Sequence, residues 1–133
     1  MVESTTVPRY GEPLASLIVL GEAETLDAGV SQEDLREQLE GLTPDFAFHG
    51  RTLVDQDAAS CCISSLWLLH HFLDESHQIS QEIDTSSGSF WHGIMHRREG
   101  DYSNAKYWFR RVADHQVYES LASASRELLD QDP

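Results

Sequence analysis

The stretch from Asp57 to about Ile83 carries apolar residues at helical spacing over most of its length. Two adjacent stripes run along it, one of Cys62, Leu66, Leu69 and Leu73 and the other of Leu68, Phe72, Ile79 and Ile83. An apolar face of that width on one helix is buried against more than one neighbour. The sequence therefore predicts a central helix over residues 57–83, with Asp57 as its N-cap.

Shorter helical patterns flank this stretch and predict an all-α fold. They cover residues 32–40, 89–98, 102–113 and 116–129, and glycines at 41 and 100 end two of them. Ser31 followed by Asp34 resembles a capping box for the first. Residues 13–20 fit a short helix or a strand, and residues 43–50 are expected to form a loop. We expect one domain over residues 1–133, a compact bundle of four to six helices with a loose N-terminal arm at 1–13.

The overall charge and hydropathy exclude some classes of partner. The chain has 9 basic and 23 acidic residues, a formal net charge of −14, which repels a nucleic-acid backbone. No apolar run approaches the roughly 18 residues of a membrane-spanning helix. The early apolar run, Leu17 to Leu20, lacks the basic leader of a signal peptide. We therefore expect a cytoplasmic protein that contacts neither nucleic acid nor membrane.

The two cysteines, Cys61 and Cys62, are adjacent in the sequence. Neighbouring residues on a helix point about 100° apart, so a bridge between them would be strained. They are interpreted as small buried residues in a reducing compartment.

The basic residues are concentrated in one window, residues 97–111. It holds five of them against two acidic residues, a local charge of +3, whereas the rest of the chain has four basic and 21 acidic residues. Arginine matches the planar geometry of carboxylate and phosphate groups. The window predicts a site for a small anionic ligand or an acidic protein segment, formed by His96, Arg97, Arg98, Asn104, Lys106, Trp108, Arg110 and Arg111. The alternative is that these arginines pair internally with Asp74, Glu75 and Glu82.

Histidines and carboxylates repeat at helical spacing on both sides of residue 86. Side chains at i, i+4 and i+7 face the same way on a helix, and imidazoles and carboxylates suit divalent metals. A helical hairpin would bring two such triplets together as a possible divalent metal site formed by His70, Asp74, His77, His92, His96 and Glu99. The alternative is that His70 and His96 are hydrogen-bonded core residues and that His77 and His92 are partly exposed.

Residues 86–113 resemble a single TPR or Sel1-like helical hairpin. The resemblance is carried by two glycines, Gly93 and Gly100, and by Tyr102, Ala105 and Phe109, at the positions where that family packs small residues against large ones. His92 and His96 stand where the family has apolar residues. The stretch 88–111 also resembles a motif of uncharacterised bacterial and fungal proteins, which implies no established activity. One hairpin does not form the family's peptide-binding groove.

No catalytic motif of a known class is evident, so the catalytic residues are unknown. The sequence favours a binding or interaction module over an enzyme. The competing hypothesis is a metal-dependent enzyme built on the histidines, and the sequence does not indicate an oligomeric state.

Overall fold

The computed structural model describes residues 10–21 and 26–131 of the chain. Within them the chain forms eight α-helices and one 3₁₀ helix and no strand, which confirms the all-α prediction. The eight helices exceed the four to six expected. Their bounds are α1 Leu14–Leu20, η1 Glu33–Leu35, α2 Arg36–Glu40, α3 Pro44–Ala47, α4 Gln56–Leu69, α5 Leu73–Ser80, α6 Ser86–Glu99, α7 Tyr102–Val112 and α8 Val117–Gln131.

The helix predicted over residues 57–83 is in fact two helices, α4 and α5. The chain leaves helical geometry at His71, whose φ is 69°, a value that favours glycine. The N–H of His71 donates to the carbonyl of Leu68, and the N–H of Phe72 donates to that of Trp67. This is the hydrogen-bond pattern that ends a helix with a left-handed residue. The single-helix prediction was therefore wrong, and α5 takes its own direction.

Other boundaries differ from the predictions because different side chains act as caps. Asp55, rather than Asp57, caps α4 by accepting from the N–H of Ala58. Thr43 caps the four-residue helix α3 inside a segment expected to be a loop. The Ser31 hydroxyl does not form a capping box, because it donates to the carbonyl of His71 at 3.0 Å.

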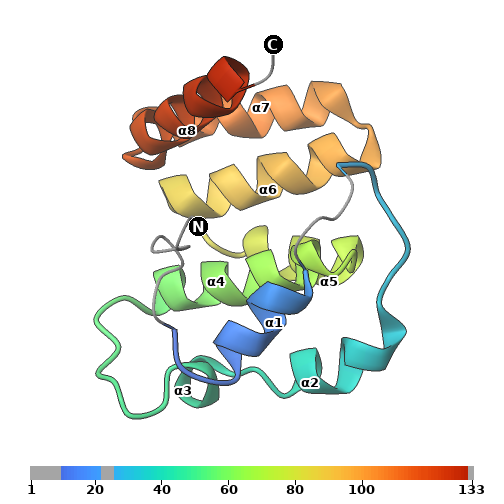
Figure 1. Ribbon diagram of the computed structural model, residues 1–133, viewed down its shortest axis with the longest axis vertical. Coiled ribbons are helices and arrows are strands. Elements are labelled where there is room, and N and C mark those ends of the chain that lie inside the picture. Colours follow the sequence, from blue (N-terminus) through green and yellow to red (C-terminus); the bar gives the residue numbers. More distant parts are fainter. Residues whose placement is uncertain (1–9, 22–25, 132–133) are drawn as a thin grey trace.

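The helices are stacked in layers (Figure 1). α7 lies on α6, α6 lies on α4 and α5, and the short helices α1 to α3 cover the opposite side of α4. The main apolar core lies on that opposite side, around Trp67 and Phe72, whose rings meet edge to face at 5.1 Å. Buried leucines from α1 and α2, Leu17 and Leu39, complete it at 1% exposure each. The α5–α6 side therefore lies outside this core and is packed with more polar residues.

α6 and α7 form a tight helical hairpin. Gly100, with φ of 90°, ends α6, and Asp101 caps α7 by accepting from the N–H of Asn104. Gly93 allows the close approach, because a Cβ there would lie 2.8 Å from the ring of Phe109. Gly93 of α6 thus packs against Phe109 of α7, as the spacing of these two residues predicted. The relationship to the TPR family stays a prediction.

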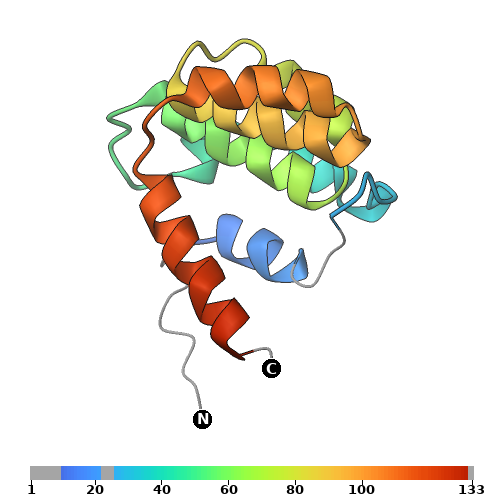
Figure 2. The same ribbon diagram turned by 90° about the horizontal axis from the view of Figure 1, so that it is seen from above.

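α8 extends away from the other helices (Figure 2), and none of its residues is buried. Among the described residues, no helix has both the length and the apolar character needed to cross a membrane. Most of the predicted N-terminal arm lies outside the described residues.

Candidate metal centre

Small side chains bring α5 close to α4. The Ser64 hydroxyl on α4 donates to the carbonyl of Ser76 on α5 at 2.9 Å, and both residues are fully buried. Thr85 is the N-cap of α6, and its hydroxyl accepts from the N–H of Gly88. α5 packs on α6 as well as on α4, the helices that follow and precede it in the chain.

Three histidines meet between these two helices. His77 comes from α5, and His92 and His96 lie one turn apart on α6. Their ring centroids are 4.6 Å apart for His77 and His92, 5.2 Å for His77 and His96, and 4.9 Å for His92 and His96. One nitrogen of each ring lies within 4.8 Å of the other two. We call these three residues the histidine cluster.

The cluster is buried on one side and accessible on the other. His92 and His96 are only 3% and 6% exposed, whereas His77 is half-buried. Trp108 of α7 stacks on the His92 ring with centroids 3.8 Å apart and planes inclined by 22°. Trp108 therefore covers one face of His92, and the site opens towards solvent at His77.

A carboxylate fixes the protonation of one member of the cluster. His96 Nδ1 lies 3.1 Å from Glu99 Oε1. An ionised carboxylate only accepts hydrogen bonds, so Nδ1 is the donor of this pair, and in the neutral ring Nε2 is the nitrogen with the lone pair. A carboxylate behind a histidine in this way orients the ring and increases its basicity towards a metal.

His92 has no such partner. Its Nδ1 is buried and makes no hydrogen bond with any described residue. Among the described residues, no other buried side-chain nitrogen or oxygen lacks a hydrogen-bond partner. Buried polar atoms without partners are rare because each costs about 1–3 kcal/mol. A bound ion, a bound water or a catalytic role each accounts for such an atom.

Burial and mutual repulsion hold two of the rings neutral. Burial lowers the pKa of His92 to about 4, helped by the neighbouring charges that His77 and His96 would carry. Burial also lowers the pKa of His77, and the field of His96 adds to this, while Glu99 and Asp74 act against it. At pH 7 His77 and His92 therefore present lone pairs, as metal ligands must.

These lowered pKa values predict a loss of stability in mild acid. Between the ordinary pKa of 6.5 and about 4 the unfolded chain binds a proton at His92 that the native protein does not. The free energy of unfolding is then at its full value above pH 6.5 and falls as the pH drops towards 4. We expect urea denaturation in the presence of a chelator to show a loss of about 1–2 kcal/mol over this range. An equal loss in a His92→Phe protein would assign the effect to other groups.

Two of the other residues predicted for the metal site, His70 and Asp74, lie apart from the cluster. His70 is 1% exposed, and its Nε2 lies 2.8 Å from the carbonyl of Leu17, so it is a core residue. The end of α4 before His71 explains this, because His70 and His77 do not lie on one helix. Asp74 is exposed and reaches His77 only through its field. Three of the six predicted ligands therefore meet, with Glu99 behind them.

The residues predicted for an anion site do not meet in one place. Arg98 turns inward, where it donates to the carbonyl of Leu68, to the carbonyl of Asp27 and to His71 Nδ1. Arg97 lies at the Tyr102 end of the hairpin, in a hollow that is also lined by Glu99 and by part of Arg98. The remaining members are on α7: Asn104, Lys106, Trp108, Arg110 and Arg111. Of the internal pairs considered, Glu75 binds Arg36 at 2.9 Å instead of an α6 or α7 arginine.

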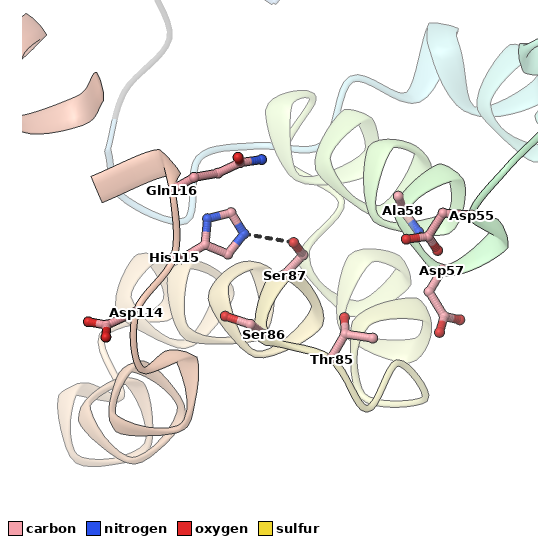
Figure 3. A pocket seen from close by; sticks show the side chains of 9 residues that line it. All are labelled: Asp55, Asp57, Ala58, Thr85, Ser86, Ser87, Asp114, His115 and Gln116. Atoms are coloured by element: carbon pink, nitrogen blue, oxygen red, sulfur yellow. Dashed lines mark hydrogen bonds between the residues drawn. The ribbon is translucent and has the colours of Figure 1, made fainter. Parts of the chain in front are cut away.

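A second polar hollow, which the sequence did not indicate, lies at the N-termini of α4 and α6 (Figure 3). It encloses about 370 Å³ and is lined by three aspartates together with Ser87 and His115, among others. His115 Nε2 lies 2.8 Å from the Ser87 hydroxyl, but its Nδ1 accepts from the N–H of Val117. The proton is then on Nε2, which donates to Ser87 and cannot take its proton. The pair is not a nucleophile with its base.

The cysteines also lack the features of a nucleophile. Burial raises the pKa of Cys61 to about 11 and raises that of Cys62 as well. Thiolate, rather than thiol, is the reactive form. Their geometry fits the predicted role as small interior residues, Cys61 buried and Cys62 half-buried.

No known protein family, curated protein or solved structure matches the chain. The histidine cluster is therefore interpreted from its own geometry and chemistry.

Proposed function

We propose that this protein binds a divalent transition-metal ion through His77, His92 and His96, with zinc as the best fit. The observation that carries the proposal is the meeting of three imidazoles, one of which, His92, has a buried Nδ1 with no partner among the described residues. A metal coordinated through that nitrogen would give it the partner it lacks. Imidazole suits zinc, copper and nickel, and zinc is commonly held by three histidines.

The spacing of the rings is compatible with coordination after a small movement. Zinc–nitrogen bonds of about 2.0–2.1 Å in a tetrahedral site place the ligand nitrogens about 3.4 Å apart. The nitrogens of the cluster lie within 4.8 Å of one another. Coordination would draw the rings closer together, and the half-buried His77 ring is the least confined of the three.

Three protein ligands leave a fourth position for water. Structural zinc sites use four protein ligands, whereas catalytic ones keep an open position. Glu99 is already bonded to His96, and Asp74 is exposed on the same side as His77. We therefore propose an open site, which is the feature that a metal-dependent enzyme would need.

Zinc titration of protein purified without a histidine tag tests the proposal. We expect calorimetry at pH 7.5 to give one zinc per chain, and His77→Ala, which removes one of three ligands, to weaken binding about a thousandfold. At a free zinc concentration one hundred times Kd, bound zinc should increase the free energy of unfolding by about 2.7 kcal/mol. This increase should raise Tm by about 8 °C.

His49→Ala is the matched control, because His49 is exposed and lies outside the cluster. It should bind zinc like the wild type. Equal losses in the two variants, or no stoichiometric binding by the wild type, would contradict the proposal.

A further inference from the structure

α7 differs in charge from the rest of the protein. Its sequence, Tyr102–Val112, holds three basic residues and no acidic one, in a chain that has 23 acidic residues against 9 basic. Two of the three, Arg110 and Arg111, lie in the last turn, where they also favour the helix dipole. Lys106 lies in the middle of the helix, where the helix dipole does not favour a basic residue.

The basic side of α7 faces solvent. Ala105 and Val112 are buried against the body, and Phe109 packs on Gly93 of α6. Lys106 and Arg110, four residues apart and so on one side of the helix, are exposed. α7 is the outer layer of the helical stack, and its main packing partner is α6 (Figure 1).

Aromatic rings lie among these charges. Tyr102 is 64% exposed and Tyr107 46%. The guanidinium of Arg111 lies 5.9 Å from the centre of the Tyr107 ring and 5.4 Å from that of Trp108, distances at which a cation is attracted to an aromatic face. The part of the chain that the structure describes offers Lys106 and Arg110 no ion pair, although acidic residues are abundant. We call Tyr102, Lys106, Tyr107, Arg110 and Arg111 the basic face.

We propose that the basic face binds an extended acidic segment of a partner protein that also carries aromatic or other apolar side chains. The charges of the two surfaces are complementary, and such complementarity steers and orients association. Residues 102–111 extend over about 14 Å along the helix axis, since each residue rises 1.5 Å. That length matches four or five residues of an extended peptide, which rise about 3.3 Å each. It exceeds what one small anion contacts.

A short acidic segment also fits the overall charge better than a nucleic acid does. The net charge of −14 repels a long polyanion at every approach, whereas a short segment meets only the local field within about 10 Å of the surface. The exposed tyrosines give an acidic segment with apolar side chains an additional contact. This surface involves none of the three histidines, so the inference is independent of the metal site.

Fluorescence anisotropy with two labelled peptides tests this inference on the full chain. One peptide alternates Glu with Phe, and the other has Gly in place of every Phe, so that the charges are equal. We expect the Glu–Phe peptide to bind more tightly and its binding to weaken with salt. Lys106→Glu with Arg110→Glu should weaken it at least about tenfold. Binding should be the same with zinc and with a chelator.

The matched control is Arg51→Glu with Arg126→Glu, which changes the net charge equally at two exposed arginines outside α7. It should leave peptide binding nearly unchanged, and circular dichroism should show that both double variants are folded. Lys106→Ala with Arg110→Ala gives the same comparison without adding negative charge. Equal weakening by both charge-reversed variants, equal binding of the two peptides, or tighter binding of a single-stranded oligonucleotide would overturn the inference.

Discussion

A protein with phenylalanine in place of His92 is expected to be more stable than the wild type and to bind zinc about a thousandfold more weakly. The two effects have opposite signs because they have different causes. The buried Nδ1 of His92, which lacks a partner in the described chain, costs the metal-free protein free energy. The same nitrogen-bearing ring is one of only three ligands proposed for the ion.

The size of each effect follows from the surroundings of the ring. Phenylalanine keeps the aromatic stack on Trp108, so the contact at 3.8 Å is retained. Removing the unsatisfied nitrogen should increase the free energy of unfolding by about 1 kcal/mol. This is the lower end of the cost of a buried polar atom, because the slightly larger phenylalanine ring needs some repacking. Losing one of three ligands costs about 4 kcal/mol, which corresponds to the thousandfold change.

Two measurements on the same preparation separate these effects. Urea denaturation with a chelator gives the stability of the metal-free protein, and competition with a chromophoric chelator gives the zinc affinity. A metal-free His92→Phe protein that is less stable than the wild type would mean that His92 has a structural partner. Undiminished zinc binding would place the ion elsewhere.

The arrangement within α6 is local enough to be predicted from sequence. His92 and His96 are four residues apart, so any helix there places them on one face, and Glu99 follows at the next position of that face. The turn at Gly100 and Asp101 is likewise marked by its residue types, since glycine ends helices and aspartate caps them. For these elements, spacing and capping carry enough information.

The break before α5 has no comparable local signal. No glycine or proline stands at residues 70–72, and His71 adopts a left-handed conformation that non-glycine residues rarely take. Contacts from distant parts of the chain accompany it: Ser31 donates to the carbonyl of His71, and Arg98 donates to its ring. A sequence pattern does not contain those contacts. The prediction therefore placed His70 in the metal site, where the structure has it in the core.

The same limitation explains the two neighbouring arginines. Arg97 and Arg98 are indistinguishable by type, and which one turns inward depends on the loop around Asp27 and on the end of α4. The basic window was therefore interpreted as one site, although Arg98 is bonded to the chain itself and the other members are divided between α6 and α7. Only the part carried by one helix, α7, remained together.

Alanine at position 88 is expected to destabilise the protein by about 2–3 kcal/mol, even though alanine is the better helix former. Gly88 lies in the first turn of α6, where helix propensity alone would favour alanine by up to about 1 kcal/mol. A Cβ there would lie 2.2 Å from the carbonyl oxygen of Ile83 and 2.8 Å from that residue's side chain. Since the nearest atom belongs to the backbone, the loop between α5 and α6 has to move, and overpacking of this kind outweighs the propensity gain.

Gly41→Ala is the matched control for this substitution. Gly41 ends α2 with φ of −76° and ψ of −7°, which alanine adopts freely, and the nearest atoms to its Cβ would be 3.6 Å away. There the loss of freedom in the unfolded chain should stabilise the protein by about 0.4–1 kcal/mol. Urea denaturation of the two variants should thus give changes of opposite sign. A stabilised Gly88→Ala protein would mean that the carbonyl of Ile83 does not lie against the first turn of α6.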